Sequence, residues 1–349
     1  MKIAVFLPNW VGDAVMATPA IKALRLQYPD AEIVGVMRPF IDDTLAGTNL
    51  IDRSLHYDPR GKSNEMKGWK FIRRLRSEQF DSAVLFPNSL RSGFLAWASG
   101  AKRRIGTDRD GRGFLLTDRV TPADKAVPNP VIEEYLKVVE AAGCQSTDRK
   151  MILATTDDDE QKLADFWRKQ PETLPESGTV CLNPGGAFGA AKHWPTESFA
   201  KLAVQISDQF QKTVLVLCGP AEREIAKSIV SLAGRENVVS LAEEKLSLGL
   251  TKAAVKSADL LVTTDSGPRH FAQPFGVPVV TLFGPTHIAW SETFYAKSIH
   301  LQIDVDCGPC QQRICPLGHH KCMTDLSVDR VFRAVEIQLQ KYASVQKVA

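Results

Sequence analysis

The segment KIAVFLPNWVGDAVMATPAI, residues 2–21, joins a short apolar run to a helix-like stretch through a turn with one glycine and one carboxylate. An apolar run followed directly by a helix pattern is typical of parallel α/β folds, which often hold a phosphate at such a turn. The carboxylate of Asp13 would repel a phosphate at the start of this helix. The segment therefore predicts an α/β sheet whose first strand leads to something other than a phosphate site.

The same alternation continues through the first half of the chain. Predicted strands lie at 2–8, 31–37, 54–58 and 82–86, and predicted helices lie near 14–27, 39–46, 65–77 and 131–142. Short β-type runs separated by helical patterns indicate a parallel sheet with crossover helices.

A second alternation follows a stretch of different character. Residues 144–178 contain the acidic run TTDDDE and the segment PETLPESG, which predict a boundary region with one exposed helix. Beyond it we expect strands at 179–185, 213–219, 238–242, 260–265 and 278–284, and helices at 196–210, 221–233, 247–257, 268–275 and 327–343.

The two alternations predict two Rossmann-like, doubly wound domains that face each other across a cleft. Ligands bind at the carboxyl ends of the strands in such domains. The expected boundaries are 1–155 for the first domain, 156–178 for a linker region, 179–326 for the second domain and 327–349 for a C-terminal helix and tail.

Composition narrows the class of protein. The 349 residues are 44% hydrophobic and 24% charged, and no apolar run approaches the ~20 residues that cross a bilayer. The first apolar run is too short for a signal peptide, so we expect a cytoplasmic protein.

Positive charge is concentrated in the first half. Residues 1–150 hold 23 basic and 18 acidic residues, a net charge of +5 against +3 for the whole chain. Basic side chains recur at 60–76 and at 102–112. Such runs are usually solvated faces, but together with the imbalance they favour an acidic acceptor or the anionic inner leaflet of a membrane, bound peripherally. We expect no nucleic-acid partner, because no nucleic-acid-binding module accompanies the charge.

The stretch TTDSGPRH, residues 263–270, is the strongest local motif. A strand ends at Asp265-Ser266-Gly267, and a helix starts with proline. An ordinary helix cap explains these residues. Alternatively, Gly267 lets a diphosphate approach the free N–H groups of the helix start, with His270 on the same turn.

Two further loops follow predicted strands in the second half. LNPGGAFGAAKHWP, residues 182–195, carries Gly185 and Gly186 in a side-chain-poor loop before Lys192, which could supply a mobile positive charge to an anionic ligand. VLCGPAERE, residues 216–224, places Glu222 where it could accept hydrogen bonds from ribose hydroxyls. A solvated loop and a first-turn acid are the plain alternatives.

Asp13 has two explanations of the same kind. It is a first-turn or capping acid, or it is a general base that faces a ligand held by the second domain.

Four cysteines close to the C-terminus form a C-x2-C-x4-C-x6-C pattern. They are Cys307, Cys310, Cys315 and Cys322, with His319 and His320 among them. A structural zinc ion and a disulfide formed in air are both compatible with this spacing, and a stapled loop is a better expectation than catalysis.

These motifs together resemble the ADP-heptose:lipopolysaccharide heptosyltransferases, particularly the heptosyltransferase II branch. The resemblance rests on NWVGDAVMATPA, PNSLRS, GGAFGAAKHWP, GPAERE, TTDSGPRHFA, LFGPT and CGPCQQRICPLGHHKCM, and it covers nearly the whole chain. It implies the GT-B fold, with the acceptor on the first domain and the nucleotide sugar on the second. It also implies inverting transfer of L-glycero-D-manno-heptose from ADP-heptose onto the first heptose of heptosyl-Kdo2-lipid A, with no cofactor required for catalysis.

The resemblance also assigns roles to residues. Asp13 matches the family's proposed base, Lys192 a lysine that neutralises the diphosphate, and Glu222 a ribose-binding acid. Donor-binding positions are Gly185, Gly186, Lys192, Glu222, Asp265, Ser266, Gly267 and His270. The candidates for acceptor binding are Asn9, Trp10, Asn88, Ser89, Arg91, Arg104 and Arg112.

Other activities remain open on the residues alone. Heptosyltransferase I activity on Kdo2-lipid A and an NDP-sugar epimerase would use a similar pair of domains. A dehydrogenase would need a dinucleotide fingerprint, which neither half carries. A zinc-stapled nucleic-acid binder would hold zinc tightly.

Overall fold

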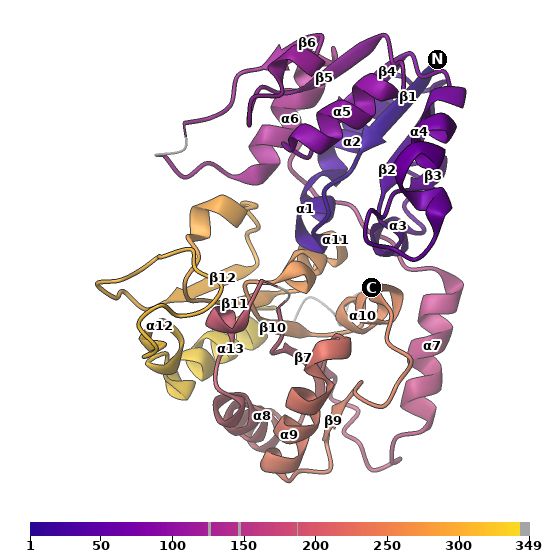
Figure 1. Ribbon diagram of the computed structural model, residues 1–349. Helices are drawn as coiled ribbons and strands as arrows, with labels where there is room; N and C mark the ends of the chain where they lie inside the picture. Colours follow the sequence, from indigo (N-terminus) through magenta and orange to yellow (C-terminus); the bar gives the residue numbers. More distant parts are fainter. Residues whose placement is uncertain (125–126, 146–147, 187, 343–349) are drawn as a thin grey trace. The chain divides into compact units, whose positions relative to one another are not determined.

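A computed structural model describes residues 1–124, 127–145, 148–186 and 188–342 (Figure 1). The chain divides into two compact units. The first comprises Met1–Ala154 and Ala289–Phe294, and the second comprises Thr155–Ile288 and Tyr295–Ala349. Each unit is built on one six-stranded sheet whose strands are all paired in parallel.

The first sheet has the strand order β3-β2-β1-β4-β5-β6. Its strands are β1 (Lys2–Phe6), β2 (Glu32–Met37), β3 (Arg53–His56), β4 (Ser82–Leu85), β5 (Arg103–Thr107) and β6 (Asp118–Val120). Strands β1, β2 and β4 are almost entirely buried, because helices cover both faces of the sheet. The order reverses between β1 and β4.

Helices of the first unit form two groups that pack among themselves. One group contains α1 (Val11–Met16), α2 (Thr18–Gln27), α3 (Pro39–Leu45) and α6 (Val131–Ala141). The other contains α4 (Gly68–Ser77) and α5 (Leu90–Ala98), with the 3-10 turns η1 (Asn64–Met66) and η2 (Gly113–Leu115). The predicted helix 14–27 is two helices that meet at Ala17, and Pro19 lies in the first turn of α2, where its missing N–H costs nothing.

The second sheet has the strand order β12-β11-β10-β7-β8-β9. Its strands are β7 (Thr179–Asn183), β8 (Thr213–Val216), β9 (Val238–Ser240), β10 (Leu260–Thr264), β11 (Val279–Phe283) and β12 (Ser298–Gln302). Read from β7, this is the same order as in the first sheet, with the reversal between β7 and β10.

The second unit has seven helices among the described residues. They are α7 (Asp157–Arg168), α8 (Thr196–Phe210), α9 (Arg223–Ala233), α10 (Leu248–Lys256), α11 (Ala272–Phe275), α12 (Lys321–Thr324) and α13 (Val328–Tyr342). Short 3-10 turns occur at η3 (Ala190–Lys192), η4 (Pro220–Glu222), η5 (Gly267–Phe271) and η6 (Ile288–Ser291), the last of which spans the division between the units. The predicted end of the last helix, residue 343, lies outside the described residues.

Helix α7 falls within the expected linker region but packs as part of the second unit. Its Asp159 is buried, and the carboxylate lies 3.7 Å from Nζ of the fully buried Lys252 on α10. Thr156 caps the helix in a capping box with Asp159. This helix therefore has one buried face and is not exposed all round.

The two strand orders confirm the prediction of two doubly wound α/β domains. The alternation of strand and helix patterns in the sequence does not predict β5, β6, β12, α5 or α12. The strand β6 has only three residues and β12 is only partly buried at a sheet edge, so neither gives a clear apolar run. Across the described ranges, no helix is both long and apolar enough to cross a membrane.

Candidate functional site

Each sheet offers one place where a ligand is expected. In doubly wound sheets, ligands bind beyond the carboxyl ends of the strands at the point where the strand order reverses. In the second unit this point lies between β7 and β10, where the loops that carry Gly185, Gly186 and Asp265–Gly267 begin. In the first unit it lies between β1 and β4, which are followed by Asn9, Trp10, Asn88 and Ser89. Most predicted site residues therefore fall at these two edges.

Asn183 joins the two loops of the second unit. Its Nδ2 donates to Thr263 Oγ1 at 2.9 Å and to Ser266 Oγ at 2.8 Å. Thr264 Oγ1 donates to the carbonyl of Gly185 at 2.8 Å. These bonds cross from β7 to β10 and fix the spacing between the glycine loop and the Ser266 turn. The motifs in the sequence do not predict Asn183 or the two threonines, although a polar residue at the end of a buried strand is a usable signal.

Lys192 and Asp265 form a buried ion pair beside these loops. Lys192 Nζ lies 2.5 Å from Asp265 Oδ2 and 2.8 Å from the Asp265 carbonyl oxygen. Thr286 Oγ1 donates to the same carboxylate oxygen at 2.7 Å, and Arg269 lies 3.4 Å from the other. Burial disfavours ionisation of Asp265, but the charges of Lys192 and Arg269 overcome it and lower the pKa of the carboxyl to about 2. Asp265 is therefore a carboxylate at every physiological pH.

This cluster presents two cationic groups to one carboxylate. Lys192 is buried, and its ammonium also lies 4.5 Å from the centre of the Phe188 ring. The charge of Lys192 is therefore fixed, not mobile as the sequence suggests, and the alternative of a solvated lysine is wrong. An ammonium group has three N–H donors, and two of them point to oxygens of Asp265.

His270 is held neutral next to the cluster. Burial of the imidazole, followed by the charge of Arg269, lowers the pKa of His270 to about 3. The side chain lies on η5, which begins at Gly267 directly after Ser266. At neutral pH the imidazole therefore carries no charge.

Glu222 lies against the glycine loop. A Cβ at Gly185 would stand 2.6 Å from Glu222 Cγ, and a Cβ at Gly219 would stand 2.5 Å from Glu222 Oε2. Any larger residue at either position would displace this carboxylate. The structure thus brings Glu222 next to Gly185, as its predicted role in donor binding requires.

Asp13 lies in the first turn of α1 in the first unit. The N-cap residue is Trp10, and its side chain makes no capping hydrogen bond. Burial raises the pKa of Tyr135, and the charge of Asp13 raises it further, which places Asp13 close to α6. Asn9 Oδ1 accepts a hydrogen bond from Arg38 Nε at 3.2 Å. Asp13 is therefore a first-turn carboxylate at the carboxyl edge of β1, and both of its predicted roles remain compatible with this position.

Two predicted acceptor-binding arginines have other tasks. Arg112 is fully buried and donates to the carbonyls of Thr107 and Pro87 and to Ser92 Oγ, and burial lowers the pKa of its guanidinium to about 10. It cannot reach a solvent-exposed acceptor and instead positions the loop of Asn88 and Ser89.

Arg104 lies near the amino end of β5, far from the carboxyl edge, and donates to the carbonyls of Leu115 and Ala101 at 2.7 Å each. Arg91 is exposed on α5.

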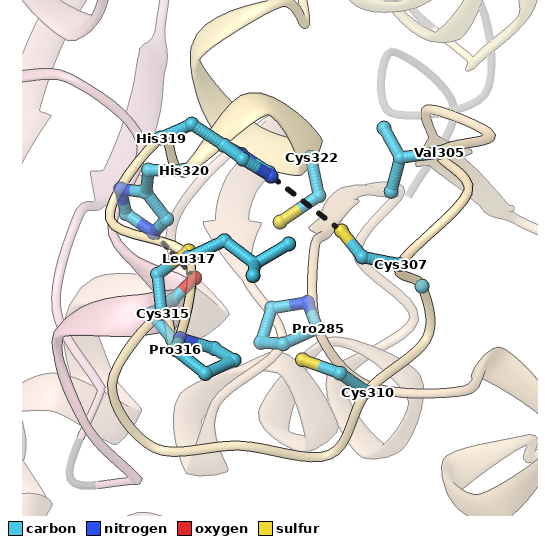
Figure 2. Close-up of a pocket in the computed structure, with 12 residues that line it drawn as sticks. Pro285, Val305, Cys307, Cys310, Cys315, Pro316, Leu317, His319, His320 and Cys322 are labelled. Carbon is cyan, nitrogen blue, oxygen red and sulfur yellow. Dashed lines mark hydrogen bonds between the residues drawn. The ribbon is translucent and has the colours of Figure 1, made fainter.

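The cysteine-rich segment borders the loop of Lys192. All four cysteines are free thiols and line one small pocket with His319 and His320 (Figure 2). The backbone amide of His320 and those of its neighbours lower the pKa of Cys315, whereas burial and the adjacent thiols raise the pKa of Cys322.

Backbone contacts fix this segment against the loop. Ala191 N donates to the carbonyl of Arg313 at 3.1 Å, and the ring of His320 lies 2.7 Å from the carbonyl of Ala191. Gly189 has φ 151° and leaves no room for a Cβ, which would lie 2.4 Å from the Arg313 carbonyl oxygen. Over the residues that the structure describes, no group of three or more His, Cys, Asp or Glu is arranged to hold a metal ion, so zinc stays a prediction.

Stability of the second unit should fall on mild acidification because of His270. Its pKa is lower in the native state than in the unfolded chain, so its stabilising effect is complete above pH 6.5 and declines as the pH falls. Between pH 7 and 5 the loss should be about 2 kcal/mol. Urea unfolding of wild type and of His270→Asn at pH 7 and pH 5 measures this loss of unfolding free energy. If the variant loses as much stability as wild type, the lowered pKa of His270 is not its cause.

Removal of the buried guanidinium should destabilise the first unit. Arg112→Met leaves the carbonyls of Pro87 and Thr107 without their donor, which should lower the free energy of unfolding by about 3 kcal/mol. The matched control is Arg91→Met on exposed α5, which should change it by less than about 0.5 kcal/mol. Equal effects in urea titrations would rule out the structural role of Arg112.

Zinc binding by the cysteine-rich segment implies a stoichiometric metal content. Protein purified under reducing conditions should contain zinc by mass spectrometry of the metals, and Cys310→Ser should lose it. Cys144→Ser, which changes a buried thiol in the first unit, should keep it. The zinc site would be excluded if purified wild type contains no metal and the cysteine thiols of residues 307–322 all react with a thiol reagent.

Comparison with known proteins identifies the family. Residues 68–321 match glycosyltransferase family 9 (heptosyltransferase). A lipooligosaccharide heptosyltransferase 2 of Campylobacter jejuni is 27% identical over 347 residues, which cover 96% of this chain and 98% of the relative. The lipopolysaccharide heptosyltransferase 2 of Escherichia coli is 26% identical over 361 residues, covering 97% of this chain and 99% of the relative.

The fold agrees with that match. The solved structure of the E. coli ADP-heptose lipopolysaccharide heptosyltransferase II superposes with a TM-score of 0.79 at 23% identity, covering 98% of this chain and 99% of that one. This likeness confirms the expected GT-B architecture. Because the family match covers well over half of the sequence, the chain belongs to glycosyltransferase family 9, the heptosyltransferases.

Proposed function

We propose that this protein transfers L-glycero-D-manno-heptose from ADP-heptose onto the first heptose of heptosyl-Kdo2-lipid A, with inversion at the anomeric carbon. The relatives that align over nearly the full length are named heptosyltransferase 2. The solved structure with the same fold is named for ADP-heptose and lipopolysaccharide. These names support the second branch and its donor for this chain.

The observation that carries the proposal is the ion cluster at the strand reversal of the second sheet. The loops at this edge contain Gly185, Gly186 and Gly267, which have no side chain of their own to keep a diphosphate away from the backbone. Lys192 and Arg269 both pair with the Asp265 carboxylate, so the cluster carries net positive charge. Negative charge develops on the departing ADP in the transition state, and fixed cations stabilise it without reorganising. Glu222, next to Gly185, accepts from the ribose hydroxyls.

Asp13 acts as the base in this proposal. The acceptor O–H bond breaks as its proton moves to the Asp13 carboxylate, and the acceptor oxygen forms a bond to the anomeric carbon. The bond from that carbon to the phosphate oxygen breaks, and ADP leaves with the electron pair. A single displacement inverts the configuration. Lys192 and Arg269 meet the charge of the leaving group, so no metal ion is required in this scheme.

Mass spectrometry of the transfer reaction tests the proposal. Wild type should add a single heptose to mono-heptosylated Kdo-lipid A. Asp13→Asn keeps the side-chain volume but removes the base, so kcat should fall at least ~100-fold while the affinity for ADP stays unchanged. Asp30→Asn, at an exposed turn of the same unit, is the matched control and should be fully active.

Each alternative has its own outcome. Extension only of acceptor that lacks heptose would assign the protein to the first branch. Turnover of the nucleotide sugar without acceptor would indicate an epimerase. Full activity of Asp13→Asn would show that Asp13 is not the base and has only a structural role in the first turn of its helix.

A further inference from the structure

Helix α4 carries exposed cations beside an exposed tryptophan. Its sequence, GWKFIRRLRS, contains four basic residues and no acidic one. Phe71 and Leu75 face the core, whereas Trp69 is 70% exposed. Lys70, Arg73, Arg74 and Arg76 are all exposed as well. The outward face of this helix is therefore positive and partly aromatic.

Helix α5 exposes large apolar side chains at helical spacing. Leu90 is 50% exposed, Phe94 43% and Trp97 55%, so residues i, i+4 and i+7 share the outer face. The rings of Phe94 and Trp97 contact each other with centroids 5.8 Å apart. The helix contains Arg91 and no acidic residue.

The two helices belong to one surface of the first unit. Phe71, Leu75, Leu95 and Ala96 point inward into the same hydrophobic cluster, and α4 packs beside α5 (Figure 1). Leu115 of η2 lies against Gly93 of α5, and its neighbour Phe114 is 73% exposed. We call this the α4–α5 surface; it comprises Trp69, Lys70, Arg73, Arg74, Arg76, Leu90, Arg91, Phe94, Trp97 and Phe114.

Such a combination of side chains is unusual on a protein surface that is exposed only to water. Single exposed leucines such as Leu26 on α2 are common, but five large apolar side chains among five cations are not. Tryptophan, phenylalanine and leucine beside lysine and arginine are typical of elements that lie in a membrane interface. Each cation near an anionic bilayer is also attracted to the negative surface potential of the lipids.

We propose that the α4–α5 surface docks the first unit peripherally on an anionic phospholipid bilayer. The aromatic side chains enter the headgroup region, and the arginines contact lipid phosphates. Helix α5 begins directly after Ser89, so docking places the Asn88–Ser89 loop at the height of the headgroups. If the proposed function holds, a lipid-anchored acceptor is presented there, but docking itself does not depend on it.

Vesicle sedimentation with the full chain tests the proposal. Wild type should bind vesicles of phosphatidylglycerol and phosphatidylcholine, bind pure phosphatidylcholine weakly, and dissociate as salt is raised. The double variant Phe94→Ser, Trp97→Ser should lower the partition coefficient into vesicles at least ~10-fold, because it buries less apolar area in the bilayer. Arg73→Glu with Arg76→Glu should abolish the preference for anionic lipid. Leu26→Ser, an exposed leucine on α2, is the matched control and should bind as wild type does.

Several results would overturn the proposal. One is equal vesicle binding by wild type and the Phe94/Trp97 double variant, with urea unfolding confirming that both are folded. Another is a wild-type dimer in size-exclusion chromatography that the double variant converts to monomer, since a second copy would then cover the surface. Binding of RNA but not of vesicles by wild type would also overturn the proposal. Transfer to detergent-dispersed acceptor should be unchanged in the double variant, which separates a failure of docking from a failure of the proposed reaction.

Discussion

The buried ion pair between Lys192 and Asp265 is the interaction on which the second unit depends. A buried carboxylate costs several kcal/mol unless its surroundings compensate for the lost water. Here the compensation comes from η3, from η5 and from Thr286 after β11. Three loops that are distant in the sequence are therefore fixed to one carboxylate, and the glycine loop is tied to the same place through Asn183 and Thr264.

In the first unit a different interaction holds the loop at the corresponding edge of the sheet. Its sheet has the same strand order, but the loop after β4 is held by the buried guanidinium of Arg112, whose partners are mainly backbone carbonyls. This arrangement positions Asn88 and Ser89 without placing a fixed charge at the edge. Asp13 then provides the carboxylate there. Two copies of one topology thus present different chemistry: one edge has a cationic cluster and the other has a carboxylate, which the proposed reaction assigns to the leaving diphosphate and the incoming hydroxyl.

Much of the fold could be predicted from the sequence because parallel strands buried on both faces give continuous apolar runs. Helix α5 was missed because its large apolar residues are divided between the core and the exposed face, which obscures a single stripe. The predicted helix 14–27 was too long because the break at Ala17 has no strong local signal.

The site was only partly predictable for a physical reason. Motifs at strand ends identified Asp265, Ser266, Gly267 and Lys192, since local sequence determines where a loop begins. Side-chain pairing between loops some 80 residues apart, such as Asn183 with Ser266, leaves no spacing pattern. A run of charged residues indicates a solvated or ligand-binding face, so nothing in the sequence separates the buried Arg112 from its exposed neighbours.

The most direct test of the account is a crystal structure of the protein with ADP bound. The account predicts the diphosphate at the carboxyl ends of β7 and β10, within hydrogen-bond distance of Lys192 Nζ and of the amides that follow Gly185 and Gly267. The ribose should lie within reach of Glu222. A diphosphate at the carboxyl ends of β1 and β4, with the Lys192–Asp265 cluster unoccupied, would contradict the assignment of the donor to the second unit.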